Sequence, residues 1–371
     1  MRAARRPRRR APSRPVAAPS APVPSRFGPA WPAARVSVCA PSIGQYRAAV
    51  NRAAGSLQWM VEIRALEAGA PGEGRIVREL AAAALTADGH PPFGDAVWRD
   101  LAHPDPAALG LVAVSPDGAR ALGYLHAATD GGTVERSTTL SLVVHPDHRG
   151  DGVGHALVAR AVDLLGAATN GTRRLQLWLF GADDWGDDFA RTAGFVRERE
   201  LRQMRVPIPL ADEPSPRWPE GITVRAFVPG RDDAAWLAVN NRAFAADPDQ
   251  SGWDEAMLKA RTTEKWFDPA GFLLAFDAQG LAGFCWTKVH AADPPLEPLP
   301  LGEIYVIGVD PDRQGTGLGR ALVVGGLGWL AEQGIRTGML FVDAANSPAV
   351  RLYEALGFRT ARVDRAYDRT V

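Results

Sequence analysis

Cysteine is scarce in this chain of 371 residues, which contains only Cys39 and Cys285. Two such residues do not form a disulfide framework, and this scarcity fits a reducing cytoplasm. Cys285 lacks the neighbours of a nucleophile, so we expect a small buried hydrophobe. The sequence also lacks a run of about twenty apolar residues, the length that a membrane-spanning helix needs. These absences argue against a disulfide-rich secreted protein and against an integral membrane protein.

Acidic residues are absent from residues 1–58, which contain eleven Arg. The whole chain has 42 basic and 42 acidic residues, so the remainder carries 42 − 11 = 31 basic groups against 42 acidic ones. An acidic body of this kind does not favour nucleic acid as a partner. The composition of 1–58, rich in Pro, Ala, Ser and Arg, predicts a disordered extension. We expect this extension to be dispensable, or the true start of the protein to be Met60. The alternative is that the extension is a transit peptide or a nucleic-acid-binding arm.

A glycine-rich loop occurs twice, each time after an apolar, β-branched run and before an apolar-periodic helix. The copies are Val309-Asp310-Pro311-Asp312-Arg313-Gln314-Gly315-Thr316-Gly317-Leu318-Gly319-Arg320 and Val144-His145-Pro146-Asp147-His148-Arg149-Gly150-Asp151-Gly152-Val153-Gly154-His155, 165 residues apart. This arrangement directs backbone N–H groups and the positive end of a helix at an anion, such as a pyrophosphate. The glycines allow the anion to approach the backbone closely.

Three further pairs of segments recur at similar offsets, of 161, 160 and 163 residues, and they indicate a tandem repeat. They are 61–66 with 222–227, 121–124 with 281–284, and 192–195 with 355–358. We therefore expect two domains, 60–206 and 220–371, each long enough for its own core. Residues 207–219, with five prolines, are expected to be the linker.

The second half shows the predicted order of elements most clearly, and the first half repeats it in outline. Alternation and helical periodicity predict the order β-α-α-β-β-β-α-β-α-β, an α/β arrangement with a mixed sheet. The predicted segments are 222–228, 232–244, 253–261, 271–276, 281–290, 301–309, 318–333, 338–342, 347–356 and a last strand from Phe358.

The element order and the paired glycine loops resemble the GNAT superfamily of acetyl-CoA-dependent N-acetyltransferases. Local segments resemble, more narrowly, a tandem-domain branch whose members acetylate the cysteinyl amine of a cysteinyl-glucosaminyl-inositol. These segments are 87–89 with 92–95, 239–241 with 243–244, 266–269, 286–290 and 301–311.

The resemblance implies two tandem GNAT acyltransferase domains, each a mixed, mostly antiparallel sheet flanked by helices. It implies acetyl-CoA as co-substrate, no metal, and a small-molecule thiol pseudodisaccharide as acceptor. We expect a cytoplasmic monomer without a nucleic-acid or membrane partner.

Cofactor contacts are expected in both halves. In the second half the resemblance implies that the strand, the glycine loop and a further helical segment contact the cofactor, the strand through its main-chain groups. These residues are Ile307, Gly308, Val309, Gln314, Gly315, Thr316, Gly317, Leu318, Gly319, Arg320, Asn346, Ser347, Pro348, Ala349, Val350 and Arg351. The corresponding residues of the first half are Leu142, Val143, Val144, Arg149, Gly150, Asp151, Gly152, Val153 and Gly154. Gly308 inside a strand predicts either a bulge or a close backbone approach, and its N–H could steady the thioester oxygen.

Glu303 is the candidate general base, because it is a lone carboxylate in an otherwise apolar strand. Burying an unpaired carboxylate is costly, so such a residue is usually paired or functional. Regular alternation would place it on one face with Tyr305, Ile307 and Val309. A solvent-facing residue on an edge strand is the alternative, and an offset of 165 makes Thr138 its counterpart.

Tyr353 is the candidate acid, since the resemblance places a tyrosine here near the CoA sulfur, where it can protonate the leaving thiolate. A tyrosine packed in the core is the alternative. Its counterpart is Ala190. Because Thr138 and Ala190 cannot act as a base and an acid, the first half is expected to be non-catalytic.

Substrate contacts follow from the resemblance alone, which places Asp95, Asp249, Lys288, Glu303 and Phe341 at the acceptor. Either Asp could instead be a solvated residue, whereas Lys288 in an aromatic strand needs a partner. Asp95 in the first half implies a cleft between the domains. Two other functions stay open: a tandem acetyltransferase for another small amine, and a non-catalytic acyl-CoA sensor.

Overall fold

The computed structural model describes residues 61–66, 72–103, 108–118, 120–129, 137–167, 173–245, 247, 250, 252–292, 297 and 299–371. The expected extension 1–58 and Cys39 lie outside the described residues. The elements of the first half are β1 (Glu62–Ala65), α2 (Glu73–Asp88), α3 (Asp95–Ala102), β2 (Leu109–Val114), β3 (Ala121–Thr129), β4 (Ser137–Val144), η2 (Pro146–His148), α4 (Val153–Ala167), β5 (Arg174–Leu179), α5 (Asp184–Thr192) and β6 (Val196–Pro207).

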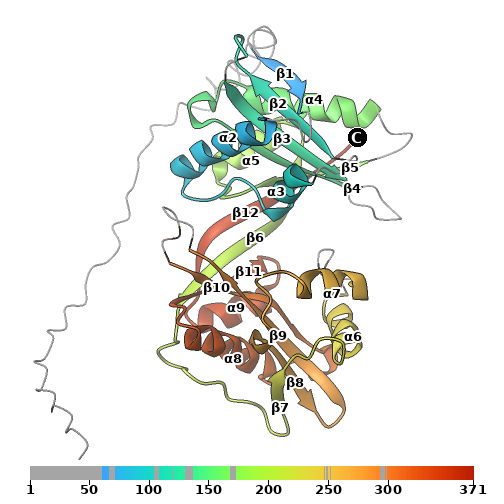
Figure 1. The fold of residues 1–371 in the computed structure, drawn as a ribbon, viewed down its shortest axis with the longest axis vertical. Coiled ribbons are helices and arrows are strands. Elements are labelled where there is room, and N and C mark those ends of the chain that lie inside the picture. The colour runs from blue at the N-terminus through green and yellow to red at the C-terminus, as the bar shows by residue number, and fades with distance from the viewer. Residues whose placement is uncertain are drawn as a thin grey trace, which may run out of the picture. The chain divides into compact units, whose positions relative to one another are not determined.

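The second half repeats this order (Figure 1). Its elements are β7 (Thr223–Ala226), α6 (Asp233–Ala243), α7 (Glu255–Thr262), η3 (Pro269–Gly271), β8 (Phe272–Asp277), β9 (Gly280–His290), β10 (Leu301–Val309), η4 (Pro311–Arg313), α8 (Leu318–Glu332), β11 (Thr337–Asp343), α9 (Ser347–Ala355) and β12 (Arg359–Thr370). These spans follow the expected segments of the second half closely.

The strands form a mixed sheet in the order β1-β2-β3-β4-β5-β12-β6-β11-β10-β9-β8-β7. Two neighbouring pairs, β4 with β5 and β10 with β11, are parallel, and the other described pairs are antiparallel. The expected mixed, mostly antiparallel sheet flanked by helices is therefore confirmed.

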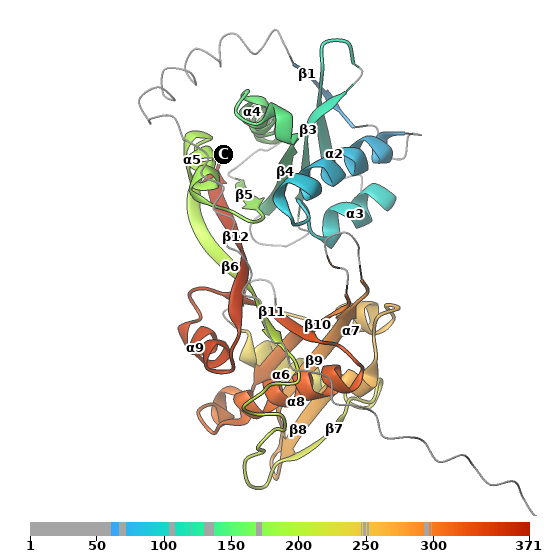
Figure 2. The ribbon, with the colours of Figure 1, turned by 90° about the vertical axis from the view of Figure 1, so that its left-hand side faces the viewer.

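The two halves exchange their last strands. The final strand of the chain, β12, pairs with β5 of the first half, and β6 of the first half pairs with β11 of the second. The two exchanged strands also pair with each other, side by side in both views (Figures 1 and 2). Residues that are distant in the sequence are thereby brought next to each other. The boundary between the two halves of the sequence does not separate two sheets, because strands of both halves belong to one sheet.

Helices cover both faces of each half. In the second half, α8 and α9 pack on one face around Leu322 and Leu340, and α6 and α7 pack on the other around Trp236 and Trp286 (Figure 1). In the first half, α4 and α5 cover one face and α2 and α3 the other. We call the face of the second half that carries α6 and α7 the acceptor face.

Candidate active site

The glycine loop of the second half leads into an α8 whose N-terminus is open. Gly315 and Gly317 have φ values of 78° and 86°, in the left-handed region that glycine tolerates. Gly317 precedes the helix, and no side chain caps it there, whereas Asn346 caps α9 by accepting from the Ala349 N–H at 3.2 Å. A Cβ at Gly315 or Gly317 would meet no atom within 4 Å. The first-turn N–H groups of α8 can therefore receive an anion such as a pyrophosphate.

The strands next to this loop part from each other. β10 pairs with β11 only from Gly302 to Ile304, although β10 continues to Val309. In the first half, β4 pairs with β5 only as far as Ser141 and continues to Val144. Beyond the pairing, main-chain groups on this side of β10 are available to an extended ligand, as the resemblance to acyl-CoA enzymes implies.

The bulge in β10 lies at Tyr305 and not at Gly308. Gly308 pairs in register with Phe284, and the register with β9 shifts between Ile304 and Val306. A Cβ at Gly308 would lie 2.8 Å from two ring atoms of Phe284. Gly308 is therefore a site of close approach, the second of the two options that the sequence left open.

This bulge changes the face to which residues of β10 point. The extra residue breaks the alternation, so Glu303 and Tyr305 do not share a face with Ile307 and Val309, as we had expected. Tyr305 packs with the aromatic core under α6 and α7, and Ile307 and Val309 pack in the core under α8. Glu303 pairs directly with Lys288, whose Nζ lies 5.0 Å from the centroid of the Trp266 ring and 5.7 Å from that of Tyr305.

Glu303 is buried on the acceptor face and has a hydrogen-bond partner. Its side chain retains 9 % of its exposure, and Oε2 lies 2.6 Å from Nε2 of His290, which is one-third exposed. When Glu303 is ionised, the imidazole N–H donates to it. The pair links a buried carboxylate to solvent through one imidazole. Sequence reasoning missed His290, although it lies two residues from Lys288 and alternation places both on one face.

Tyr353 of α9 lies on the opposite face of the sheet. Only 6 % of the residue is exposed, and its ring centroid lies 5.7 Å from that of Phe358. Burial, with a smaller contribution from Cys285, raises the pKa of the Tyr353 phenol well above its usual range. The phenol therefore keeps its proton at neutral pH, as a general acid must. Cys285 itself is fully buried, and burial raises the pKa of its thiol.

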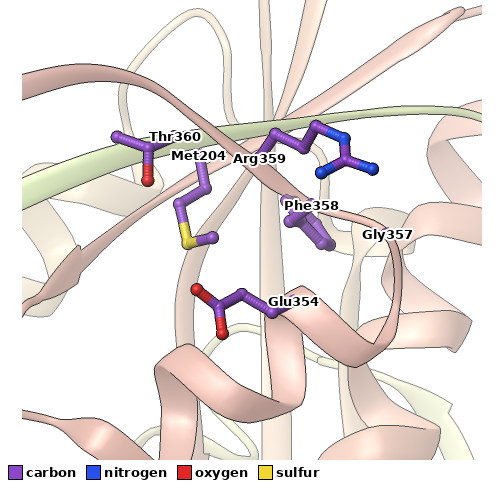
Figure 3. A pocket seen from close by; sticks show the side chains of 6 residues that line it. All are labelled: Met204, Glu354, Gly357, Phe358, Arg359 and Thr360. Carbon is purple, nitrogen blue, oxygen red and sulfur yellow. The ribbon is translucent and has the colours of Figure 1, made fainter.

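A cavity of about 300 Å³ adjoins α9 (Figure 3). It is lined by Met204, Glu354, Gly357, Phe358, Arg359 and Thr360. Met204 and Phe358 belong to the core on the side of α8 and α9. This cavity therefore lies on the face of the sheet opposite Glu303.

The substrate residues implied by the resemblance are partly brought together. Lys288 and Glu303 are directly opposite each other, and Met339, which pairs with Glu303, lies two residues before Phe341. Phe341 is 36 % exposed on the same face. Asp249 and the side chain of Asp95 lie outside the described residues, although Asp95 is the first residue of α3.

The glycine loop of the first half is arranged differently. Arg149 forms a two-point ion pair with Asp88, with N–O distances of 2.6 and 2.7 Å. A Cβ at Gly154 would lie 3.0 Å from the Phe189 ring, and His155 Nε2 lies 2.8 Å from Thr192 Oγ1. The start of α4 therefore packs against α5, whereas a Cβ at the corresponding Gly319 would meet only Val309, at 3.6 Å.

The candidate catalytic side chains, Glu303 and Tyr353, have no chemical equivalents in the first half. β4 has no extra residue like Tyr305, so the strand pairing makes Thr139 the counterpart of Glu303, and the expected Thr138 was wrong by one residue. Thr138 instead points into the core, where its hydroxyl accepts from Arg173. Thr139 is equally unable to act as a base.

The described side chains of His, Cys, Asp and Glu form no group of three or more that could hold a metal ion. Among the helices of the described residues, none is long and apolar enough to cross a membrane.

The model of the Acetyltransferase (GNAT) family matches this chain twice, over residues 75–195 and 237–358. The chain belongs to this family and is a tandem, acetyl-CoA-dependent N-acetyltransferase. The mycothiol acetyltransferase of Thermobispora bispora is 43% identical over 303 residues, which cover 81% of this chain and 97% of that protein. The mycothiol acetyltransferase of Streptomyces coelicolor is 46% identical over 264 residues, covering 71% and 81%.

Solved structures show the same tandem architecture. A GCN5-related N-acetyltransferase from Sphaerobacter thermophilus has a TM-score of 0.65 at 26% identity and covers 84% of this chain and 95% of its own. A tandem GNAT protein from the clavulanic acid biosynthesis pathway has a TM-score of 0.64 at 20% identity, covering 84% and 98%, and supports the fold alone. The expected superfamily and its duplication are confirmed.

Proposed function

We propose that this enzyme acetylates the cysteinyl amine of 1-D-myo-inosityl 2-(L-cysteinylamido)-2-deoxy-α-D-glucopyranoside, giving mycothiol and CoA. The observation that carries the proposal is the similarity to mycothiol acetyltransferases along nearly the whole length of the first relative. The pairing of Lys288 with Glu303, next to the exposed ring of Phe341, supports it.

Acetyl-CoA is bound by the second half in this proposal. The N-terminus of α8 holds the pyrophosphate, with Gly315 and Gly317 giving it access to the backbone. The pantetheine arm then runs along β10 beyond Ile304, where β11 no longer pairs with that strand. The segment from Asn346 to Arg351, at the start of α9, completes the grip.

Glu303 and Tyr353 act on the two sides of the transferred acetyl group. The acceptor amine is an ammonium in neutral water, and Glu303 removes a proton from it, while the His290 N–H that donates to Oε2 holds the carboxylate in place. The amine nitrogen then attacks the thioester carbonyl, and a main-chain N–H of β10 beyond Ile304, on the side away from β9, steadies the oxyanion. As the C–S bond breaks, Tyr353 protonates the departing thiolate. The two side chains lie on opposite faces, and the parting of β10 and β11 gives both access to one thioester.

The first half is non-catalytic in this proposal, because Thr139 and Ala190 replace the base and the acid. Its glycine loop, with Arg149 and Gly152, contributes to acetyl-CoA binding or to stability rather than to turnover. We further propose that the enzyme works as a monomer in the cytoplasm.

A panel of amines tests the choice of acceptor. Release of the CoA thiol is measured with the cysteinyl pseudodisaccharide, cysteine amide, an aminoglycoside and a peptide N-terminus. We expect the highest kcat/KM with the pseudodisaccharide. A higher value with another amine would support the second enzyme function, and no turnover with any amine would favour an acyl-CoA sensor.

Replacing Tyr353 with Phe removes the proposed acid and keeps the ring against Phe358. We expect kcat to fall by about 10²–10⁴-fold, because the thiolate must leave without a proton. Acetyl-CoA binding, measured by calorimetry, should stay close to that of the wild type. An unchanged kcat would return Tyr353 to a packing role.

A further inference from the structure

Arg362 reaches the acceptor face because of a second bulge. The register between β12 and β6 shifts between Thr360 and Arg362. If Ala361 paired regularly and formed no bulge, Arg362 would lie three residues after Arg359 in unbroken alternation and would face the other side of the sheet. With it, Arg362 pairs directly with Gln203, and Gln203 pairs on its other side with Phe341 of β11. Directly opposite side chains share a face, so the three form a row across three strands.

The guanidinium of Arg362 is held between two aromatic rings. Its Cζ lies 5.8 Å from the centroid of the Phe341 ring and 5.5 Å from that of the Phe180 ring. Its Nη2 donates to Asp364 Oδ2 at 2.8 Å. Its Nε is buried without a hydrogen-bond partner among the residues that the structure describes, and 15 % of the side chain is exposed. The arginine thus has a fixed orientation and donor capacity that Asp364 does not use.

Asp364 fixes this orientation of the guanidinium. Its side chain is 1 % exposed, and its second oxygen accepts from the Gly181 N–H at 3.0 Å. Because Asp364 neutralises the charge of Arg362, the pair offers N–H donors without net charge. Such a pair suits neutral hydroxyl groups better than an anion, whose binding would also meet the carboxylate.

The surroundings of Arg362 include segments of both halves. The Phe180 ring is 3.8 Å from the position of a Cβ at Gly94, the residue before α3. Phe180 therefore connects the beginning of α3 in the first half with Arg362, and through it with Phe341 in the second. The strand exchange creates this neighbourhood, since β6 and β12 supply Gln203 and Arg362.

We propose that Arg362 is a specificity-determining residue that binds hydroxyl groups of the polyol part of the acceptor. The planar guanidinium donates to neighbouring hydroxyls, and the exposed ring of Phe341 packs against the C–H face of the sugar or cyclitol. Asp364 is its positioning residue. This inference rests on the proposed function, because it requires a polyol attached to the amine.

Two variants, Arg362→Gln and Arg362→Lys, test the assignment with two acceptors. Loss of a hydrogen bond to a charged group predicts a KM for the pseudodisaccharide that is about 10–100-fold higher. The KM for acetyl-CoA and the kinetics with cysteine amide, which lacks the polyol, should stay within about twofold of the wild type, since the chemistry is untouched. The lysine variant keeps a partner for buried Asp364, so it remains informative if the glutamine variant folds poorly.

Arg369→Gln is the matched control. Arg369 lies on the same strand, donates to the Ala193 carbonyl at 2.8 Å and stacks on the Phe195 ring, away from the acceptor face. Its loss should leave the KM for the pseudodisaccharide unchanged. Equal losses with both acceptors, or an unchanged KM for the pseudodisaccharide in both Arg362 variants, would overturn the assignment. A wild-type enzyme that does not acetylate the pseudodisaccharide would instead refute the proposed function, and the role of Arg362 with it.

Discussion

Replacing Glu303 with Gln is expected to lower kcat by about 10²–10⁴-fold, equivalent to roughly 3–5 kcal/mol of barrier. The amide keeps the shape of the carboxylate and can still bond to His290, which lies 2.6 Å away in the wild type. It cannot take the proton from the ammonium of the acceptor. Steady-state kinetics with the pseudodisaccharide, at several pH values, measure the effect.

The control for this prediction is acetyl-CoA binding, which should be retained because the α8 N-terminus and β10 main chain are unchanged. Raising the pH supplies more free amine and should recover part of the rate in the variant. Wild-type turnover in Glu303→Gln at neutral pH would remove the carboxylate from the mechanism.

Replacing Gly317 with Leu is expected to abolish acetyl transfer. The side chain would occupy the open space at the start of α8, where the pyrophosphate is proposed to bind. A residue other than glycine at φ 86° also adds strain of about 1–2 kcal/mol. Acetyl-CoA affinity and turnover are both measured, and both should be lost.

Gly152→Leu is the matched control, because Gly152 has the same φ of 86° at the equivalent place in the first half. It carries the same strain and should lower thermal stability by a similar amount, but most turnover should remain. Loss of activity in Gly152→Leu together with full activity in Gly317→Leu would show that the active half has been assigned the wrong way round.

The sequence predicts much of this fold because periodicity and glycine placement are local signals. The strand Leu301–Val309 and the start of α8 at Leu318 agree with their expected positions. The face of Ile307 was predicted wrongly relative to Glu303, because a bulge is one extra residue that leaves the apolar run unbroken.

The exchange of last strands was also absent from the sequence analysis. In a duplicated chain, β6 and β12 have similar patterns, so either could complete either sheet, and only the tertiary pairing decides between them. Arg362 and Gln203 therefore gave no local sign of lying beside Phe341. Alternation along β9 places His290 on the same face as Lys288, so its contact with Glu303 could have been predicted from the sequence, but it was not.

We propose that the acetyl group passes directly from CoA to the cysteinyl nitrogen, and an acceptor with a methylated thiol tests this step. The free thiol of the cysteinyl group could also accept an acetyl group and pass it to its own amine, whereas an S-methyl group cannot. Competition with the free thiol acceptor first establishes that the methylated compound binds. Mass spectrometry should then show one acetyl group on the methylated acceptor, formed by the wild type and at least about 10²-fold more slowly by Glu303→Gln. Binding without acetylation, while the free thiol acceptor is converted, would contradict direct attack by the amine at Glu303.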